Sequence, residues 1–158
     1  MRDIDTLIVG SRVYKGREDR RLIFDQAEGW DMLPGEGVDR VVDLENDLAP
    51  HEDGIFAHVE CVSVLEHARR PWMIATNIER LLCAGGTLLL HVPFVWRVHG
   101  YPSDYWRFTV NGVRLLFPRI MWHELRFNTG EGEKIRSTNI AGVPFFARTQ
   151  VHGFGSRT

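Results

Sequence analysis

Apolar residues occur along the chain in short runs that end at glycine, proline or polar positions. This pattern is typical of buried strands that alternate with amphipathic helices. The stretch 56–109 shows it most clearly: an apolar run ends at Ser63, an amphipathic segment follows, and a second apolar run stops at Pro93. This order predicts a strand, a crossover helix and a second strand parallel to the first.

The same pattern predicts the remaining elements. Strands are expected at residues 6–9, 29–33, 38–44, 56–63 and 87–92, and helices at 19–27, 70–82 and 111–117. Gly85 is expected to cap the helix over 70–82. Two late, edge-type strands, 125–127 and 143–149, are expected to form a hairpin around the polar residues between them. A turn at 34–37 leaves no room for a crossover helix between the second and third strands, so the pairing of these two strands stays open.

Composition fits one globular domain over residues 1–158 and disfavours several classes of partner. Hydrophobic residues make up 44% of the chain and charged residues 25%, which is ordinary for a soluble protein. A net charge of −2 offers no basic excess for nucleic acid, and no apolar run is long enough for a membrane span. Cys61 and Cys83 lie in or beside apolar segments, as reduced thiols of a cytoplasmic protein do. No metal site is predicted, because the chain has no Cys-x-x-Cys pair and its histidines are scattered.

Candidate ligand-binding residues follow the predicted strands at their carboxyl ends, where open parallel sheets bind ligands. Gly10 and Ser11 end the first strand; glycine permits close approach of a ligand, and the amides that follow can hold an anion. Asp31 follows the second strand and can accept hydrogen bonds from ribose hydroxyls, or cap the turn before Pro34. Asp43 ends the third strand and can accept from the exocyclic amine of adenine, or cap a loop. The dinucleotide fingerprint G-x-G-x-x-G is absent, which argues against an ordinary NAD site.

The end of the fourth strand offers a further group of polar residues. Ser63 and Val64 can line a ligand there. Glu66 and His67 can act as a base, as a ligand pair or as a structural cap. A structural role is favoured for Glu66.

These residues belong to longer motifs that together carry a family resemblance. The motifs are LIVGS (7–11), WDMLP (30–34), VVDLEND (41–47), CVSVLEHARRPW (61–72), LLCAGGTLLLHVPF (81–94) and HGYPSDYWRFT (99–109). They resemble the class I S-adenosylmethionine-dependent methyltransferases, in the broad group called methyltransferase type 11. The most specific parts are residues 64–67, 85–86, 92–94 and 101–109.

The resemblance implies a Rossmann-like, doubly wound α/β fold: a mostly parallel, seven-stranded sheet flanked by helices, with an antiparallel hairpin at its C-terminal end. It implies S-adenosylmethionine as the cofactor, and an enzyme that transfers a methyl group to a small-molecule or glycan acceptor. By the family pattern, the loop of Gly10 and Ser11 would face the methionine part of the cofactor. Asp31 with Met32 would hold the ribose, and Asp43 with Leu44 would lie at the adenine. Ser63 with Val64 would line the floor of the site beneath the sulfonium.

The chain resembles a trimmed form of that fold. One glycine precedes Ser11 where the family has two or three, no helix precedes the first strand, and a turn replaces the helix between the second and third strands. These departures leave a second hypothesis, a non-catalytic scaffold or subunit that forms a homodimer or needs a partner chain. A third, another nucleotide-dependent enzyme such as an oxidoreductase, is disfavoured by the missing glycine fingerprint.

Methyl transfer from a sulfonium is an in-line displacement, so the protein mainly orients the two reactants. A base is needed when the acceptor is a hydroxyl. His67, His99, Asp104 and Tyr105 follow the fourth and fifth strands, and His99 and Asp104 are the predicted catalytic residues. The competing interpretation is that the aromatic loop around them only packs on the sheet, with Arg107 paired to Asp104.

Overall fold

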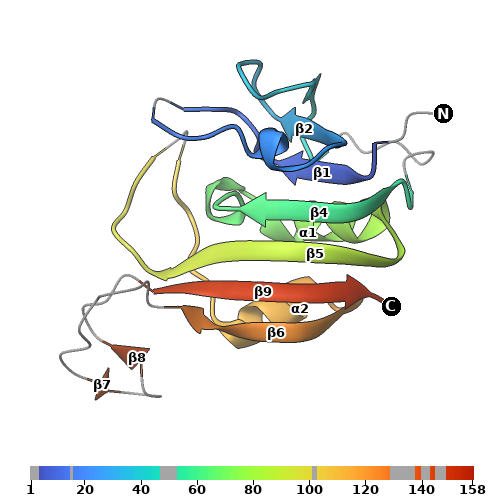
Figure 1. Ribbon diagram of the computed structural model, residues 1–158. Helices are drawn as coiled ribbons and strands as arrows, with labels where there is room; N and C mark the ends of the chain where they lie inside the picture. Colours follow the sequence, from blue (N-terminus) through green and yellow to red (C-terminus); the bar gives the residue numbers. More distant parts are fainter. Residues whose placement is uncertain are drawn as a thin grey trace.

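The computed structural model describes residues 4–14, 16–46, 53–100, 103–128, 138–139, 143–144 and 149–158. Seven strands form one sheet in the order β3-β2-β1-β4-β5-β9-β6 (Figure 1). They are β1 (Thr6–Val9), β2 (Ala27–Asp31), β3 (Arg40–Val41), β4 (Phe56–Val62), β5 (Leu82–Val95), β6 (Ile120–Asn128) and β9 (Thr149–Arg157). The helices are α1 (Pro71–Leu81) and α2 (Val110–Leu116), and the 3-10 helices are η1 (Arg20–Ile23) and η3 (Leu65–His67).

Six strands of this sheet run in one direction and β9 runs against both of its neighbours, β5 and β6. This is the Rossmann-like, mostly parallel α/β sheet that the family resemblance implies. The chain builds outward from β1 through β2 to β3, and then returns to place β4 on the other side of β1. In open α/β sheets such a switch point, at the carboxyl ends of the strands, is where ligands bind.

The second and third strands pair in parallel, which answers the question that the sequence left open. Trp30 lies opposite Arg40 and Asp31 opposite Val41, and residues 32–39 between the strands contain no helix. Asp39 holds this short connection, since its amide donates to the Gly29 carbonyl (2.8 Å) and its carboxylate accepts from the Gly29 amide (2.8 Å). The third strand is therefore much shorter than the predicted 38–44.

The helix predicted at 19–27 is only the short η1, and β2 already begins at Ala27. Asp19 caps η1, as its side chain accepts from the Arg21 amide. The apolar residues that suggested an amphipathic helix are exposed, Leu22 to 83% and Ile23 to 60%. Because they do not face the core, no apolar stripe supports a longer helix.

The C-terminal strand differs most from the prediction. An antiparallel pair does form from late strands, but the partner of β6 is β9, which begins at the last residue of the predicted strand 143–149. Residues 145–148 of that prediction lie outside the described residues. Val143–Pro144 (β8) pairs with Thr138–Asn139 (β7) in a separate two-stranded sheet. β9 is not an edge strand, because it lies between β5 and β6 (Figure 1). The glycines of β9 have low strand propensity, so the sequence did not indicate a strand there.

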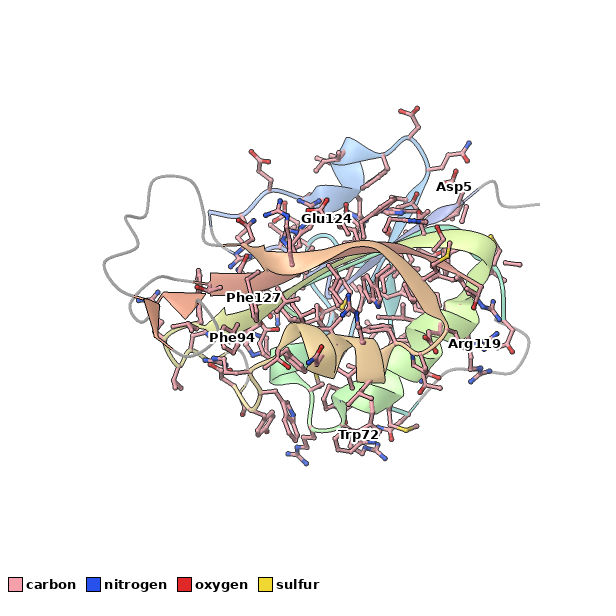
Figure 2. The ribbon with its side chains drawn as sticks, turned by 90° about the horizontal axis from the view of Figure 1, so that it is seen from below. Asp5, Trp72, Phe94, Arg119, Glu124 and Phe127 are labelled. Carbon is pink, nitrogen blue, oxygen red and sulfur yellow. The ribbon has the colours of Figure 1, made fainter. Side chains whose placement is uncertain are left out.

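Helices α1 and α2 lie side by side on one face of the sheet (Figure 2). Pro71 occupies the first turn of α1, as predicted. The helix passes directly into β5 at Leu82, so Gly85 is not its cap. Instead Gly85, with a φ of +76°, lies in the irregular stretch where the pairing of β4 with β5 shifts register.

The core lies between these helices and the central strands. Fully buried side chains include Leu7 of β1, Val59 of β4, Leu88 and Leu90 of β5, and Ile78 of α1. Both cysteines are free, and Cys61 is buried among these residues. Across the described ranges no helix has the length and apolar character that crossing a membrane requires.

Candidate functional site

The predicted cofactor residues lie in a row along the carboxyl ends of the parallel strands. Gly10 follows β1, Asp31 ends β2, and Ser63 follows β4. The Gly10 amide donates to the Trp30 carbonyl at 2.8 Å, which places the first two strand ends side by side. A Cβ atom on Gly10 would lie 2.5 Å from Val64 Cγ2, so the ends of β1 and β4 are also in contact.

The first four amides after β1, those of residues 10–13, already donate within the chain, which corrects the expectation that they hold an anion. The amides of Gly10 and Ser11 both donate to the Trp30 carbonyl, that of Arg12 donates to Asp31 Oδ2 at 3.3 Å, and that of Val13 donates to the Glu36 carbonyl. Because the loop folds back onto the end of β2, these amides form hydrogen bonds within the chain. The φ of +67° at Gly10 is needed for that path.

Ser11 is turned away from the open edge of the sheet. Its side chain lies over Gly29 of β2, where an added Cβ would be 2.6 Å from the hydroxyl oxygen. The hydroxyl is buried and has no hydrogen-bond partner among the described residues. Ser11 therefore packs the loop against β2, and only Gly10, which is exposed, faces outward.

The Asp31 carboxylate lies at the carboxyl edge of the sheet, and among the described residues it accepts fewer hydrogen bonds than it can. Oδ1 accepts from the Leu33 amide at 2.9 Å and Oδ2 from the Arg12 amide at 3.3 Å. A carboxylate oxygen has two lone pairs, so each oxygen can accept one further hydrogen bond. Met32, next to it, exposes 53% of its surface. The turn-capping and the ligand-binding interpretations of Asp31 are compatible.

Asp43 and Leu44 lie at the end of the row beyond β3. The Asp43 carboxylate accepts from the Glu45 amide (2.9 Å) and from the Asn46 side chain (2.7 Å), as a loop cap does. Leu44 belongs to the buried core, and its carbonyl accepts from Asn77 of α1 at 2.7 Å. The Leu44 side chain therefore faces the core rather than an open adenine site.

Ser63 carries the one unusual backbone conformation in the row. Its φ is +55°, the left-handed region, and among the described residues it is the only one other than glycine with a positive φ. Its amide donates to the His91 carbonyl of β5 at 3.0 Å, which fixes the turn at the end of β4. Strain of this kind is concentrated at functional sites.

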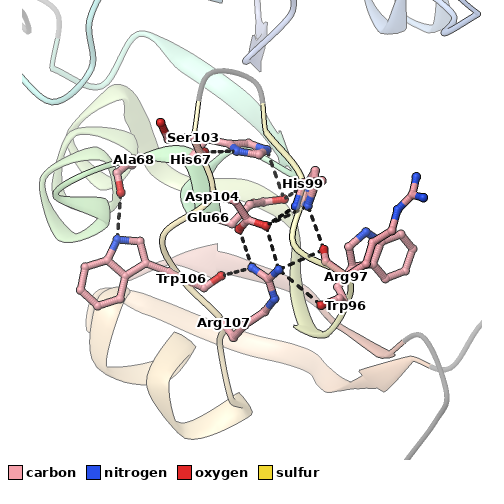
Figure 3. A network of polar contacts seen from close by, with 10 residues as sticks. All are labelled: Glu66, His67, Ala68, Trp96, Arg97, His99, Ser103, Asp104, Trp106 and Arg107. Carbon is pink, nitrogen blue, oxygen red and sulfur yellow. Dashed lines mark hydrogen bonds and ion pairs between the residues drawn. The ribbon is translucent and has the colours of Figure 1, made fainter.

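A second cluster adjoins the first, because η3 begins directly after Val64 (Figure 3). Asp104 is its anchor, with a side chain only 2% exposed. It accepts from Arg107 at 2.5 and 2.8 Å and from the His99 amide at 2.8 Å. The Arg107 guanidinium holds the pKa of Asp104 well below its usual range. The expected pairing of Arg107 with Asp104 is thus confirmed.

His99 lies against this anchored carboxylate. Its Nδ1 is 3.0 Å from Asp104 Oδ2 and 3.3 Å from the Arg97 carbonyl. The Arg97 carbonyl and the ionised Asp104 carboxylate can only accept hydrogen bonds. Nδ1 of His99 therefore carries the ring proton, and Nε2 keeps a lone pair. The His99 side chain is 28% exposed, and its Nε2 lies 4.0 Å from Glu66 Oε1. The structure brings the two predicted catalytic residues into contact.

Glu66 is the most buried charged residue of this cluster, with a side chain 1% exposed. Its Oε2 has no hydrogen-bond partner within the described part of the chain. Burial raises the pKa of Glu66 to about 7, and the neighbouring Asp104 acts in the same direction. The Glu66 backbone carbonyl accepts from the Tyr105 amide at 2.7 Å, which ties η3 to the aromatic loop.

His67, which the sequence offers as a candidate base beside His99, completes the cluster. Its Nδ1 lies 2.6 Å from the Ser103 carbonyl, and its Nε2 lies 3.8 Å from Glu66 Oε1. His99 Nε2 lies 4.0 Å from the same Glu66 oxygen. These two histidines are far apart in the sequence but meet in space, because the residues after the neighbouring strands β4 and β5 lie side by side. The adjacency of those two strands is the signal that could have indicated a contact between His67 and His99.

Trp106 of the aromatic loop has a structural role, whereas Tyr101 and Pro102 lie outside the described residues. Trp106 donates from its indole nitrogen to the Ala68 carbonyl at 2.8 Å and stacks edge to face with Trp72 of α1. Tyr105, the fourth candidate base, is 47% exposed. The packing interpretation therefore holds for Trp106.

These residues fit part of S-adenosylmethionine. The unused lone pairs of Asp31 suit the two ribose hydroxyls, and the exposed Met32 offers apolar surface beside them. Gly10 and the Ser63 turn flank the switch point between β1 and β4. The amides of residues 10–13 do not fit an anionic group, since each already donates within the chain.

Neither a protein-family model nor any curated protein sequence matches the chain. Solved structures do match it. One is 1,6-didemethyltoxoflavin-N1-methyltransferase of Burkholderia thailandensis with bound 1,6-didemethyltoxoflavin and S-adenosylhomocysteine, at 12% identity and a TM-score of 0.66, covering 98% of this chain and 72% of that one. Another is a SAM-dependent methyltransferase from Archaeoglobus fulgidus, at 10% identity and a TM-score of 0.64, covering 99% and 87%.

A third match comes from the complex between the Haloferax volcanii Trm112 methyltransferase activator and a methyltransferase, at 16% identity and a TM-score of 0.61, covering 97% of this chain and 82% of that one. At such identities the likeness concerns the fold. The chain has the class I S-adenosylmethionine-dependent methyltransferase fold, which confirms the resemblance drawn from the motifs.

Proposed function

We propose that this protein transfers a methyl group from S-adenosylmethionine to a small-molecule or glycan acceptor. One observation carries the proposal: Gly10, Asp31 and the strained Ser63 gather at the strand ends around the switch point of a methyltransferase fold. The cluster of Asp104 and His99 begins immediately beyond that point.

The cofactor supplies an activated methyl group on a sulfonium, so the protein has mainly to bind and orient. Asp31 accepts the ribose hydroxyls through its two unused lone pairs, and Met32 lies beside it. Gly10 gives the close approach at the end of β1, and Ser63 with Val64 forms the floor. Asp43 accepts at the adenine end. Holding two reactants in attacking geometry removes on the order of 7–11 kcal/mol from a barrier.

His99 takes the proton of the acceptor hydroxyl at Nε2. Asp104 holds the ring through Nδ1 and, being ionised, stabilises the imidazolium that forms. Histidine is a common general base in enzymes. General-base assistance of this kind contributes roughly 10²–10⁴-fold.

Calorimetric titration of the purified chain with S-adenosylmethionine tests the proposal. We expect saturable binding that weakens at least tenfold in Asp31→Ala. Asp25→Ala, an exposed acid before β2, is the matched control and should bind as the wild type does. Asp104→Ala should weaken binding less than Asp31→Ala, and NADH should not bind. Equal losses of affinity in Asp31→Ala and Asp104→Ala would show that Asp31 does not bind the ribose.

The role of His99 has its own test. We expect His99→Ala to leave the dissociation constant for the cofactor within about twofold and to reduce turnover by roughly a hundredfold, the range for losing a general base. S-adenosylhomocysteine formation, followed with an acceptor found by screening sugars and small hydroxylated molecules, measures this. A larger loss of cofactor affinity than of turnover would move His99 into the cofactor site.

A non-catalytic scaffold or subunit, working as a homodimer or with a partner chain, is the second candidate. The consumed amides of residues 10–13 favour it, because they leave the methionine end of the cofactor without donors from this loop. In that case residues 1–158 would act as one domain awaiting a second chain. No binding of S-adenosylmethionine at millimolar concentration would select this candidate over the enzyme.

A further inference from the structure

One ligand atom from each of Glu66, His67 and His99 lies within 4.8 Å of the other two, beside η3 (Figure 3). Glu66 Oε1 faces the Nε2 atoms of both histidines. We propose that these residues bind a divalent first-row transition-metal ion such as Zn²⁺. This goes beyond methyl transfer, since the ion needs no methyl donor to bind.

The tautomers of both histidines direct lone pairs at this point. His67 Nδ1 faces the Ser103 carbonyl and His99 Nδ1 faces Asp104 and the Arg97 carbonyl. A carbonyl or carboxylate cannot donate, so both Nδ1 atoms must carry the protons. Both Nε2 atoms are then acceptors facing a carboxylate, an arrangement that repels unless a cation or a proton lies between them.

The supporting contacts are those of a metal site. A histidine ligand typically donates its other ring nitrogen to a carboxylate or a backbone carbonyl. His99 does so to Asp104, and His67 does so to Ser103. Asp104 is fixed in turn by Arg107. The Glu66 side chain, 1% exposed, is directed into the cluster with one oxygen unpartnered among the described residues.

The ligand set and the distances favour a small ion. Two imidazoles and one carboxylate suit Zn²⁺ and its first-row neighbours, and leave a coordination position open. Ligands about 2.1 Å from a tetrahedral ion lie about 3.4 Å apart. Glu66 Oε1 is 3.8 Å from His67 Nε2 and 4.0 Å from His99 Nε2. A closure of about half an ångström, within the reach of side-chain rotation, brings Glu66 Oε1 to ligand spacing from each histidine.

Metal binding would change the chemistry of the neighbouring site. The ion takes the Nε2 lone pair of His99, so that in the metal-bound protein the ion acidifies an acceptor hydroxyl in place of the imidazole. The position left open by the three ligands would be available to the acceptor oxygen. A chelator would abolish turnover on this route and would leave it unchanged if His99 alone is the base.

Titration of the chelator-treated full chain with Co²⁺, without S-adenosylmethionine, tests the site directly. We expect one Co²⁺ per chain, visible absorption bands of a four- or five-coordinate ion, and displacement of those bands by Zn²⁺. His67→Ala, His99→Ala and the nearly isosteric Glu66→Gln should each weaken binding at least a hundredfold. Asp104→Asn should weaken it about 10–100-fold, as loss of a supporting contact does.

Two variants serve as controls for histidines elsewhere. His123→Ala removes a histidine of β6, and His152→Asn disrupts the contact between His152 and His91 across β9 and β5. Both should bind Co²⁺ as the wild type does, and far-ultraviolet circular dichroism verifies that every variant is folded. Binding that is retained in folded Glu66→Gln and His99→Ala would overturn the proposal, as would binding that is lost only in His152→Asn. Absence of Co²⁺ and Zn²⁺ binding at micromolar concentration would overturn it too, and would leave a proton as the shared cation.

Discussion

The imidazole rings of His67 and His99 lie edge to face, with their centroids 4.9 Å apart and their planes at 82°. His67 belongs to η3 after β4, and His99 follows β5, so the contact exists only because these two strands are neighbours in the sheet. It places two lone pairs and a buried carboxylate beside the strand ends where the cofactor residues gather. The proposed methyl-transfer and metal sites are therefore one continuous region.

Ser63 stores backbone strain that a glycine would release. A residue in the left-handed region costs about 1–2 kcal/mol when it carries a side chain. We expect Ser63→Gly to raise the free energy of unfolding by up to about 1 kcal/mol, and Ser63→Val to lower it by more than that. Urea unfolding measures both. Ser156→Gly in β9 is the control and should destabilise the protein by about 0.5–1 kcal/mol, as glycine does within a strand.

Should Ser63→Gly instead destabilise the chain as much as Ser156→Gly does, the positive φ at Ser63 would carry no strain. Cofactor binding by Ser63→Gly separates strain from function. We expect it to bind S-adenosylmethionine as the wild type does, because glycine adopts the same backbone path.

Arg107 clamps the loop that carries His99. It donates to both oxygens of Asp104 and to the carbonyls of Trp96 and Arg97. We expect Arg107→Gln to lower the free energy of unfolding by roughly 1.5–3 kcal/mol, the range for hydrogen bonds to charged groups. Arg126→Gln removes an exposed pair with Glu124 and should cost less than about 1 kcal/mol. Equal costs in chemical unfolding would show that the clamp adds nothing.

His91 makes the stability of the sheet depend on pH. Burial lowers the pKa of His91 in the folded protein, and the nearby His152 and Arg20 act in the same direction, against Glu60. The unfolded chain therefore binds more protons near and below a pH of about 6.5, so stability is full above that pH and falls as the solution is acidified. His91→Asn should flatten this slope between pH 5 and 7 in urea unfolding. His58, whose pKa burial also lowers, contributes in the same direction. Glu66, whose pKa burial raises to about 7, contributes in the opposite direction over this window. An unchanged slope in His91→Asn would contradict this.

Gly153 of β9 leaves room for side chains of the neighbouring strand β6. A Cβ atom there would lie 2.5 Å from Trp122 Cζ3 and 2.8 Å from Leu125 Cδ1. We expect Gly153→Ala to lower the free energy of unfolding by about 1–3 kcal/mol through overpacking. Gly112→Ala in α2, where the nearest atom would be 3.4 Å away, should be neutral or stabilising, because alanine favours helix. Thermal unfolding of both variants gives the comparison, and similar losses in the two would exclude overpacking at Gly153.

Much of the fold could be predicted from the sequence because its central elements follow simple periodicity. The apolar runs of β1 and β4 and the amphipathic stripe of α1 were placed to within about a residue of the structure. β9 was misplaced because Gly153 and Gly155 remove the side chains by which a strand is recognised. Those glycines are needed because Trp122 and Ile120 of β6 pack where side chains would otherwise project.

The site was predictable where it follows strand ends and not where it depends on loop paths. Asp31 and Ser63 end strands, so their place at the carboxyl edge followed from topology. The consumed amides of Gly10 and Ser11 did not, because they depend on the loop folding back onto Trp30. The pairing of His67 with His99 also needed three-dimensional adjacency, which spacing along the chain does not contain.

The most direct test of the cofactor site is amide NMR of the isotope-labelled chain titrated with S-adenosylhomocysteine. We expect the largest shifts at Gly10, Asp31, Ser63 and Val64, and none at Leu115, an exposed residue of α2. That result would locate the methyl donor at the switch point between β1 and β4. Saturable shifts centred elsewhere, or no shifts at millimolar ligand, would contradict it.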